Sequence, residues 1–172
     1  VFTSDNGGAN YIELEDINKP YRGWKISFFE GGIRVPYIVS WPDEINPGKK
    51  SDSAVHHFDI FPTIAKAAGI ESIHTLDGVD LLPFIKNEKQ TKPHKTLFWR
   101  SGNHQSVLHE KWKYIISKKE NFRWLFDTSV DPLESNNLIE SHPEVARKIE
   151  ELMTKFNSEQ NDPLFPASYD VP

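Results

Sequence analysis

The chain opens with Val1-Phe2-Thr3-Ser4-Asp5-Asn6-Gly7-Gly8, and this stretch decides how the rest is interpreted. Two apolar residues followed by Thr and Ser are typical of the end of a buried β-strand. The two glycines then allow the backbone to turn sharply. Such a turn would hold Asp5 and Asn6 outside the carboxyl end of the strand, which is the edge where open α/β sheets bind ligands.

Asp5 and Asn6 admit two interpretations. Asp-Asn-Gly after a strand is ordinary turn chemistry. Alternatively, the carboxylate and the amide oxygen belong to a metal site, and an all-oxygen pair suits calcium or magnesium rather than zinc. Calcium takes about six to eight oxygen ligands, so these two residues would form only part of such a site.

A second informative stretch runs through Tyr21-Arg22-Gly23-Trp24-Lys25-Ile26-Ser27-Phe28-Phe29-Glu30-Gly31-Gly32-Ile33-Arg34-Val35-Pro36. A single lysine is usually a solvated surface charge. The residues around Lys25 are largely apolar, so its aliphatic stem would be packed and its ammonium directed at one place. We expect Glu30-Gly31-Gly32 to form a tight turn with glycine at positive φ, and Glu30 and Arg34 to form a structural ion pair.

In series, these motifs resemble the sulfatase family, the arylsulfatase-like branch of the alkaline phosphatase superfamily. The resemblance starts with Thr-Ser-Asp-Asn-Gly and continues with a lysine five residues before Glu-Gly-Gly-x-Arg-x-Pro. It covers most of the chain in order. Its later segments are Asp59-Ile60-Phe61-Pro62-Thr63-Ile64, Leu76-Asp77-Gly78-Val79-Asp80-Leu81-Leu82 and Leu125-Phe126-Asp127-Thr128-Ser129-Val130-Asp131-Pro132-Leu133-Glu134-Ser135-Asn136-Asn137-Leu138.

The resemblance implies a calcium-assisted sulfate ester hydrolysis, with Asp5 and Asn6 as metal ligands and Lys25 as the residue that neutralises the substrate sulfate. It also implies a formylglycine nucleophile, matured from Cys or Ser in a Cys/Ser-x-Pro-x-Arg motif. This chain contains neither cysteine nor Ser-x-Pro-x-Arg. We therefore expect the C-terminal part of a sulfatase that is inactive alone and needs the missing N-terminal part as its partner. The family resemblance suggests a periplasmic, secreted or lysosomal location.

The amino-acid composition excludes several other classes of protein and site. The 172 residues carry a net charge of −5, which provides no basic patch for nucleic acid. No apolar run approaches the roughly 20 residues of a membrane span. The absence of cysteine excludes disulfides and thiolate metal sites.

The expected fold class is α/β. Residues 1–93 would form the C-terminal part of an alkaline-phosphatase-like sulfatase domain. Residues 94–172 would form a small α+β subdomain, with a four-stranded antiparallel sheet, a C-terminal helix and an extended tail after Asn161. The four expected strands are Thr96–Ser101, Gln105–Glu110, Trp112–Ser117 and Phe122–Asp127.

Two helices are predicted from apolar spacing. The first covers Phe58–Ala68, with Asp59 as N-cap and Gly69 as stop, and its expected apolar face is Ile60, Ile64, Ala67 and Ala68. A capping box formed by Ser141 and Glu144 would start the second, whose apolar face would lie on the sheet. That face is Val145, Ile149, Leu152, Met153 and Phe156.

The first part of the chain also contains expected loops and strands. Residues 9–24 are polar and irregular and suggest a loop over the active-site edge. Val1–Ser4 and Ile33–Trp41 are expected to be apolar strands of a parallel sheet that the missing part completes. Asp80 is expected to cap a short helix at Leu81 and Leu82. His56, His57 and Asp59 suggest a metal site, but a capped helix start explains them better because no second cluster completes the ligands.

Arg100, Asn103 and His104 fall between the first two expected strands. They are either ordinary surface hairpin residues or substrate-binding residues that grip the organic part of the substrate. The substrate itself is a sulfated small molecule or sugar, and aryl and carbohydrate sulfates remain equally open.

Two alternatives compete with the sulfatase interpretation. A phosphatase or phosphodiesterase of the same superfamily usually holds two metals with histidine among the ligands, and Asn6 in place of a histidine argues against it. The other alternative is a non-catalytic C-terminal module that acts through surface contacts.

Overall fold

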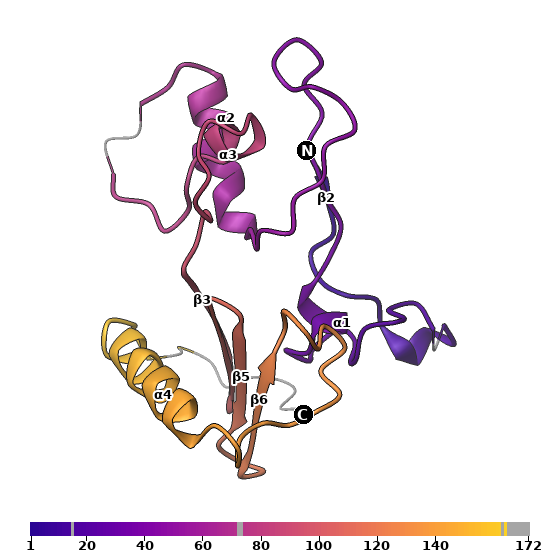
Figure 1. Cartoon of the computed structure of the whole chain (residues 1–172), viewed down its shortest axis with the longest axis vertical. Helices are drawn as coiled ribbons and strands as arrows, with labels where there is room; N and C mark the ends of the chain where they lie inside the picture. The colour runs from indigo at the N-terminus through magenta and orange to yellow at the C-terminus, as the bar shows by residue number, and fades with distance from the viewer. Residues whose placement is uncertain (15, 72–73, 163, 165–172) are drawn as a thin grey trace. The chain divides into compact units, whose positions relative to one another are not determined.

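The computed structural model describes residues 1–14, 16–71, 74–162 and 164 (Figure 1). The chain divides into two compact units. Unit 1 comprises Val1–Thr3 and Tyr37–Lys95, and unit 2 comprises Ser4–Pro36 and Thr96–Pro172. The division after Lys95 lies close to the expected one after residue 93, but Ser4–Pro36 belongs with the antiparallel sheet and not with the preceding unit.

Unit 1 contains two very short strands, β1 (Phe2–Thr3) and β2 (Tyr37–Ile38). They pair with each other in antiparallel register, Phe2 opposite Ile38. The two strands are shorter than expected and antiparallel to each other, so their assignment to a parallel sheet is wrong for this chain. Phe2 is 66% and Ile38 57% exposed, which agrees with the expectation that their neighbours belong to the missing part. A pair of two-residue strands has too little area to bury its own side chains.

Helix α2 (Ile60–Ala67) follows a 3₁₀ turn at His57–Asp59 and ends before Gly69, which has φ +72°. The helix and its stop are confirmed, but the predicted apolar face is wrong. Ile64 is 52% exposed, whereas Thr63 is buried. Helix α3 (Leu82–Ile85) follows. Its N-cap residue is Leu81 and not Asp80, but the Asp80 carboxylate accepts from Leu82 N at 2.9 Å, so it does bond the helix start as expected.

Unit 2 is built on a four-stranded antiparallel meander in the order β3-β4-β5-β6. Three strands have the predicted bounds, and β4 is displaced by one residue. The strands are β3 (Thr96–Ser101), β4 (His104–His109), β5 (Trp112–Ser117) and β6 (Phe122–Asp127). Non-glycine residues at positive φ, Glu110 and Asn121, lie in the second and third hairpin turns and allow the tight reversals.

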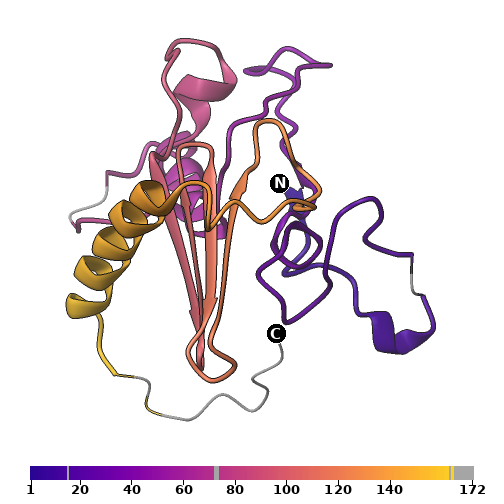
Figure 2. The same ribbon diagram turned by 60° about the horizontal axis from the view of Figure 1, so that its bottom comes forward.

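Both faces of this sheet are covered (Figure 2). Helix α4 (Pro143–Ser158) places Ile149 and Met153 against Tyr114 and Leu125 on one face. On the other face, the segment before α1 (Glu30–Ile33) places Phe29 against Ile115 and Phe126. Alternate residues of β5 thus enter two separate cores, as the period of a β-strand requires.

The start of α4 differs from the prediction. His142 is the N-cap residue, and no side chain caps the helix. Ser141 Oγ donates instead to Leu138 O at 3.1 Å, so the expected capping box is wrong. The predicted apolar face does lie on the sheet, with Ile149 and Met153 buried. Most of the tail predicted after Asn161 lies outside the described residues.

Over the part of the chain that the structure describes, none of the helices combines the length and the apolar character needed to cross a bilayer.

Candidate functional site

The turn that follows β1 is ordered by its own short hydrogen bonds. Ser4 Oγ donates to Asn6 O at 2.9 Å, and Asn6 N donates to Asp5 Oδ1 at 3.0 Å. Asn6 Nδ2 donates to Gly7 O at 2.9 Å, so its amide oxygen stays available as an acceptor. Asp5 is exposed and Asn6 is half-buried. The two residues therefore offer oxygen ligands from one turn whose backbone is fixed.

Gly8 connects this turn to Asn18 and Lys25 through hydrogen bonds. Its N donates to Asn18 Oδ1 at 2.7 Å, and its carbonyl accepts from Asn18 Nδ2 at 2.8 Å. The same carbonyl accepts from Lys25 N at 3.0 Å. The structure thus brings the Lys25 backbone against the turn that carries Asp5 and Asn6, although they are about twenty residues apart in sequence.

The glycines of this region permit close backbone packing. A Cβ on Gly7 would lie 1.8 Å from Gly31 O, and one on Gly32 would lie 2.0 Å from Ser27 O. Gly31 and Gly32 are buried in the helical turn α1. They are not among the residues with positive φ, so that part of the turn prediction is wrong. Glycine is needed because three backbone segments meet where a side chain would collide.

Lys25 is half-buried and precedes a strained residue. Ile26 has φ +87°, which is rare for a β-branched side chain and costs about 1–3 kcal/mol. Ser27 Oγ accepts from Trp24 N at 3.1 Å and donates to Trp24 O at 2.9 Å, which closes the turn around Lys25. Strain of this size persists where the surroundings determine the backbone, as they do here.

A buried ion-pair network anchors α1 to the sheet. Lys113 Nζ of β5 lies 2.7 Å from Glu30 Oε1 and 2.8 Å from Glu134 Oε1, and both Lys113 and Glu134 are fully buried. Glu134 Oε2 also accepts from Glu30 N at 2.6 Å. Burial raises the pKa of Glu134 even though Lys113 opposes the shift. The predicted pair of Glu30 with Arg34 is confirmed at 3.3 Å.

Sequence reasoning assigned no role to Asn18, Lys113 or Glu134. Glu134 lies in the quoted Asp-Pro-Leu-Glu segment, which was the available signal. Lys113 is a lone lysine in an apolar strand, and it becomes informative only when both faces of the sheet are known to be covered. No local pattern distinguishes Asn18 from any other loop asparagine.

The other predicted binding residues lie at the hairpin ends of unit 2. Arg100 Nη2 donates to Asn161 O at 2.8 Å. Asn103 O accepts from Lys118 N at 3.0 Å. His104 is buried, and its Nε2 lies 3.1 Å from Glu120 Oε2. All three contacts lie within unit 2, and the role of these residues toward a substrate stays a prediction.

In unit 1, His56, His57 and Asp59 form a helix start, as expected. The carboxylate of buried Asp59 accepts from His56 N at 2.8 Å and from Val79 N at 2.9 Å, and His94 Nε2 lies 2.8 Å from it. Burial raises the pKa of Asp59, but the hydrogen bonds from His94 and the two backbone groups outweigh this and lower it. His56 is the N-cap of the 3₁₀ turn, and Asp59 completes its capping box. Asp59 is also the N-cap residue of α2, as predicted, although its side chain makes no capping hydrogen bond to that helix.

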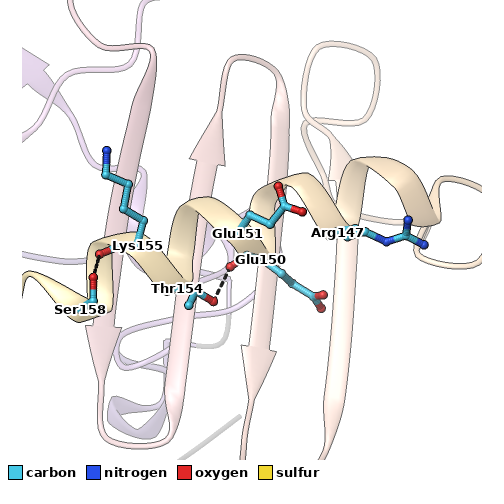
Figure 3. A pocket seen from close by; sticks show the side chains of 6 residues that line it. All are labelled: Arg147, Glu150, Glu151, Thr154, Lys155 and Ser158. Atoms are coloured by element: carbon cyan, nitrogen blue, oxygen red, sulfur yellow. Dashed lines mark hydrogen bonds between the residues drawn. The ribbon is translucent and has the colours of Figure 1, made fainter.

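No cluster of three or more His, Cys, Asp or Glu residues that could hold a metal occurs among the described residues. A hollow of about 430 Å³ lies along α4 (Figure 3). The residues labelled there all come from that helix, and four of them are charged, two positively and two negatively. None belongs to the site around Gly8.

Comparison with known proteins identifies the class to which this arrangement belongs. Steryl-sulfatase of Rattus norvegicus is 34% identical over 148 residues, covering 81% of this chain and 25% of that protein. N-acetylgalactosamine-6-O-sulfatase of Bacteroides thetaiotaomicron is 28% identical, covering 89% of this chain and 35% of that protein. The crystal structure of Ps i-CgsB in complex with k-i-k-neocarrahexaose superimposes with a TM-score of 0.81 at 27% identity, covering 97% of this chain and 38% of that one.

The fold is therefore that of the sulfatases. Residues 23–162 match the family model described as N-sulphoglucosamine sulphohydrolase, C-terminal, and the chain belongs to that family. It spans about a quarter to a third of the length of the curated relatives above.

Proposed function

We propose that the full-length protein that contains this chain hydrolyses a sulfate monoester of an aryl compound or a carbohydrate. Family membership and the sulfatase relatives support the reaction class. The observation that carries the residue assignment is the hydrogen bond from Lys25 N to Gly8 O, because it joins the lysine to the Asp5–Asn6 turn.

In this proposal, Asp5 and Asn6 are two ligands of a calcium ion. Their carboxylate and amide oxygens are the hard donors that calcium prefers, and the fixed turn presents both from one place. Two residues are too few to complete the coordination sphere, so the remaining ligands must come from elsewhere in the full-length protein. When bound, calcium would act as a Lewis acid toward the sulfate group.

Lys25 binds the sulfate and neutralises its charge. Its ammonium is a compact positive charge with three donors, which suits a tetrahedral oxyanion. The closed Trp24–Ser27 turn fixes the position from which its side chain starts, so less conformational entropy is lost when the sulfate binds.

The nucleophile has to be supplied by another part of the protein. The chain contains no cysteine and no Ser-x-Pro-x-Arg sequence that could mature to formylglycine. We therefore expect the isolated chain to be inactive, and its contribution to be the Asp5–Asn6 ligands and Lys25.

The test is Lys25→Ala in the full-length protein, with 4-nitrophenyl sulfate as substrate. Removal of an electrostatic stabiliser should lower kcat by roughly 10²–10³-fold. Lys148→Ala is the control, because Lys148 is an exposed lysine of helix α4 that lies outside the site. An unchanged kcat in Lys25→Ala would show that Lys25 serves only as scaffold.

A further inference from the structure

The loop between the Gly8 turn and Lys25 exposes more apolar surface than a polar loop should. Tyr11 is 62% exposed, and Ile12, Leu14 and Ile17 are each about half exposed. Tyr11 and Ile12 lie on a 3₁₀ turn (Asn10–Ile12) without buried residues. Clustered exposure of this kind marks a binding surface more often than isolated exposed residues do.

This apolar surface is continuous with the candidate sulfate site. The Tyr11 ring meets the Trp24 ring edge to face at a centroid distance of 5.7 Å, and Trp24 precedes Lys25 directly. Ile17 lies over Gly8, since a Cβ built on Gly8 would be 2.5 Å from Ile17 Cγ2. The neighbouring Asn18 then holds Gly8 through two hydrogen bonds. The aromatic pair and the sulfate-binding lysine are thus parts of one anchored segment.

The charge of the loop restricts what this surface can bind. Residues 9–24 contain three acidic and two basic residues, Lys19 and Arg22, and Arg22 Nη1 donates to Glu134 O at 3.1 Å. Asp16 is paired with Lys19 at 2.7 Å, whereas Glu13 is exposed. A substrate with several sulfates along its length would meet like charges here, and like charges within a Debye length of about 10 Å repel.

We propose that Tyr11 and Trp24 bind the flat, apolar ring system of a substrate that carries a single sulfate. This inference rests on the proposed function, because Lys25 holds the sulfate end of the same molecule. An aromatic pair beside a point charge suits a ligand that is apolar at one end and anionic at the other. Within the two substrate groups left open above, the loop favours aryl and similar ring sulfates over polysulfated carbohydrates.

The experiment compares two substrates in the full-length protein, 4-methylumbelliferyl sulfate and galactose 6-sulfate. Tyr11→Ala should raise KM for the flat aryl ester roughly tenfold, with kcat within about twofold, because the lost contact is present in both ground and transition states. KM for the sugar ester should change less than about twofold. Tyr11→Phe should retain the wild-type KM, because it keeps the ring.

Val130→Ala is the matched control, since Val130 is also a highly exposed apolar residue of unit 2 but lies outside this loop. An unchanged KM for the aryl ester in Tyr11→Ala overturns the inference and leaves the proposed function standing. An equal KM increase for both esters, or a fall in Tm as large as for a core substitution, also overturns it, because Tyr11 would then be covered by protein. A wild-type protein that hydrolyses neither ester, nor any other sulfate monoester, removes both proposals.

Discussion

Each of the two units of this chain is stabilised internally by a different kind of interaction. Unit 2 has two apolar cores, one on each face of a regular antiparallel sheet, and a buried ion-pair network on one of those faces. Unit 1 has few buried apolar side chains and is organised around the carboxylate of Asp59 and the hydroxyl of Thr63. It exposes Phe2, Ile38, Phe61 and Ile64.

This difference indicates that unit 2 is the more stable of the two units. Apolar burial contributes about 25 cal/mol per Å², so a sheet covered on both faces can support the strained turn at Ile26. A unit held by a few hydrogen bonds depends on each of them, because an unmet buried polar group costs about 1–3 kcal/mol. The proposed sulfate-binding segment belongs to unit 2, the better supported of the two.

Lys113→Met is the strongest test of unit 2. It leaves the carboxylates of Glu30 and Glu134 together without their shared cation, and breaking a buried pair in this way costs about 3–5 kcal/mol. Urea unfolding followed by tryptophan fluorescence should show this loss. Lys118→Met, at an exposed position just after the same strand, should match the wild type. Equal stability of both variants would mean that the apolar cores alone support the unit.

Local patterns predicted the sheet well because alternation along a strand depends on neighbouring residues only. The strand bounds therefore agree within one residue. The roles of Gly31 and Lys113 depend on segments far away in sequence, which no local pattern contains. Position 31 has to be glycine because the backbone of Gly23 lies close to it. Lys113 can be buried because it pairs with Glu30 and Glu134.

The candidate site was accessible to sequence reasoning only through its motifs. Asp5, Asn6 and Lys25 stand in segments that resemble a known family, and the structure adds the Gly8 link between them. The loop around Tyr11 has no such motif, and its apolar character was hidden by the acidic residues between the apolar ones.

For unit 1, Asp59→Asn should cost about 2–3 kcal/mol near neutral pH, because hydrogen bonds to a charged carboxylate contribute about 1.5–3 kcal/mol. The lowered pKa of Asp59 stabilises the folded state above the ordinary aspartate pKa of about 3.9. This contribution disappears as the pH falls through the lower folded-state value. Hydrogen exchange of the α2 amides between pH 3 and 7 measures it.

The wild-type α2 amides should lose protection towards pH 3, beyond the known pH dependence of intrinsic exchange, and Asp59→Asn should show little of that extra loss. Asp43→Asn, an exposed carboxylate in the same unit, serves as control and should behave like the wild type. If Asp59→Asn retains the full pH dependence, other groups stabilise unit 1 and the contrast between the units has to be revised.

The smallest predicted losses of stability concern two substitutions that test which face of α2 is buried. Thr63 Oγ1 donates to Asp59 O at 2.6 Å and accepts from Leu81 N at 3.0 Å. Thr63→Val keeps the shape but leaves Leu81 N without its acceptor, so it should cost about 1–2 kcal/mol. Ile64→Ser, at the neighbouring exposed position, should stay within about 0.5 kcal/mol. The hydrophobic pattern alone predicts the reverse order, so hydrogen exchange of the α2 amides in the two variants distinguishes the two explanations of this helix. A larger loss for Ile64→Ser would mean that an apolar surface, rather than the Asp59–Thr63 hydrogen bonds, holds α2 in place.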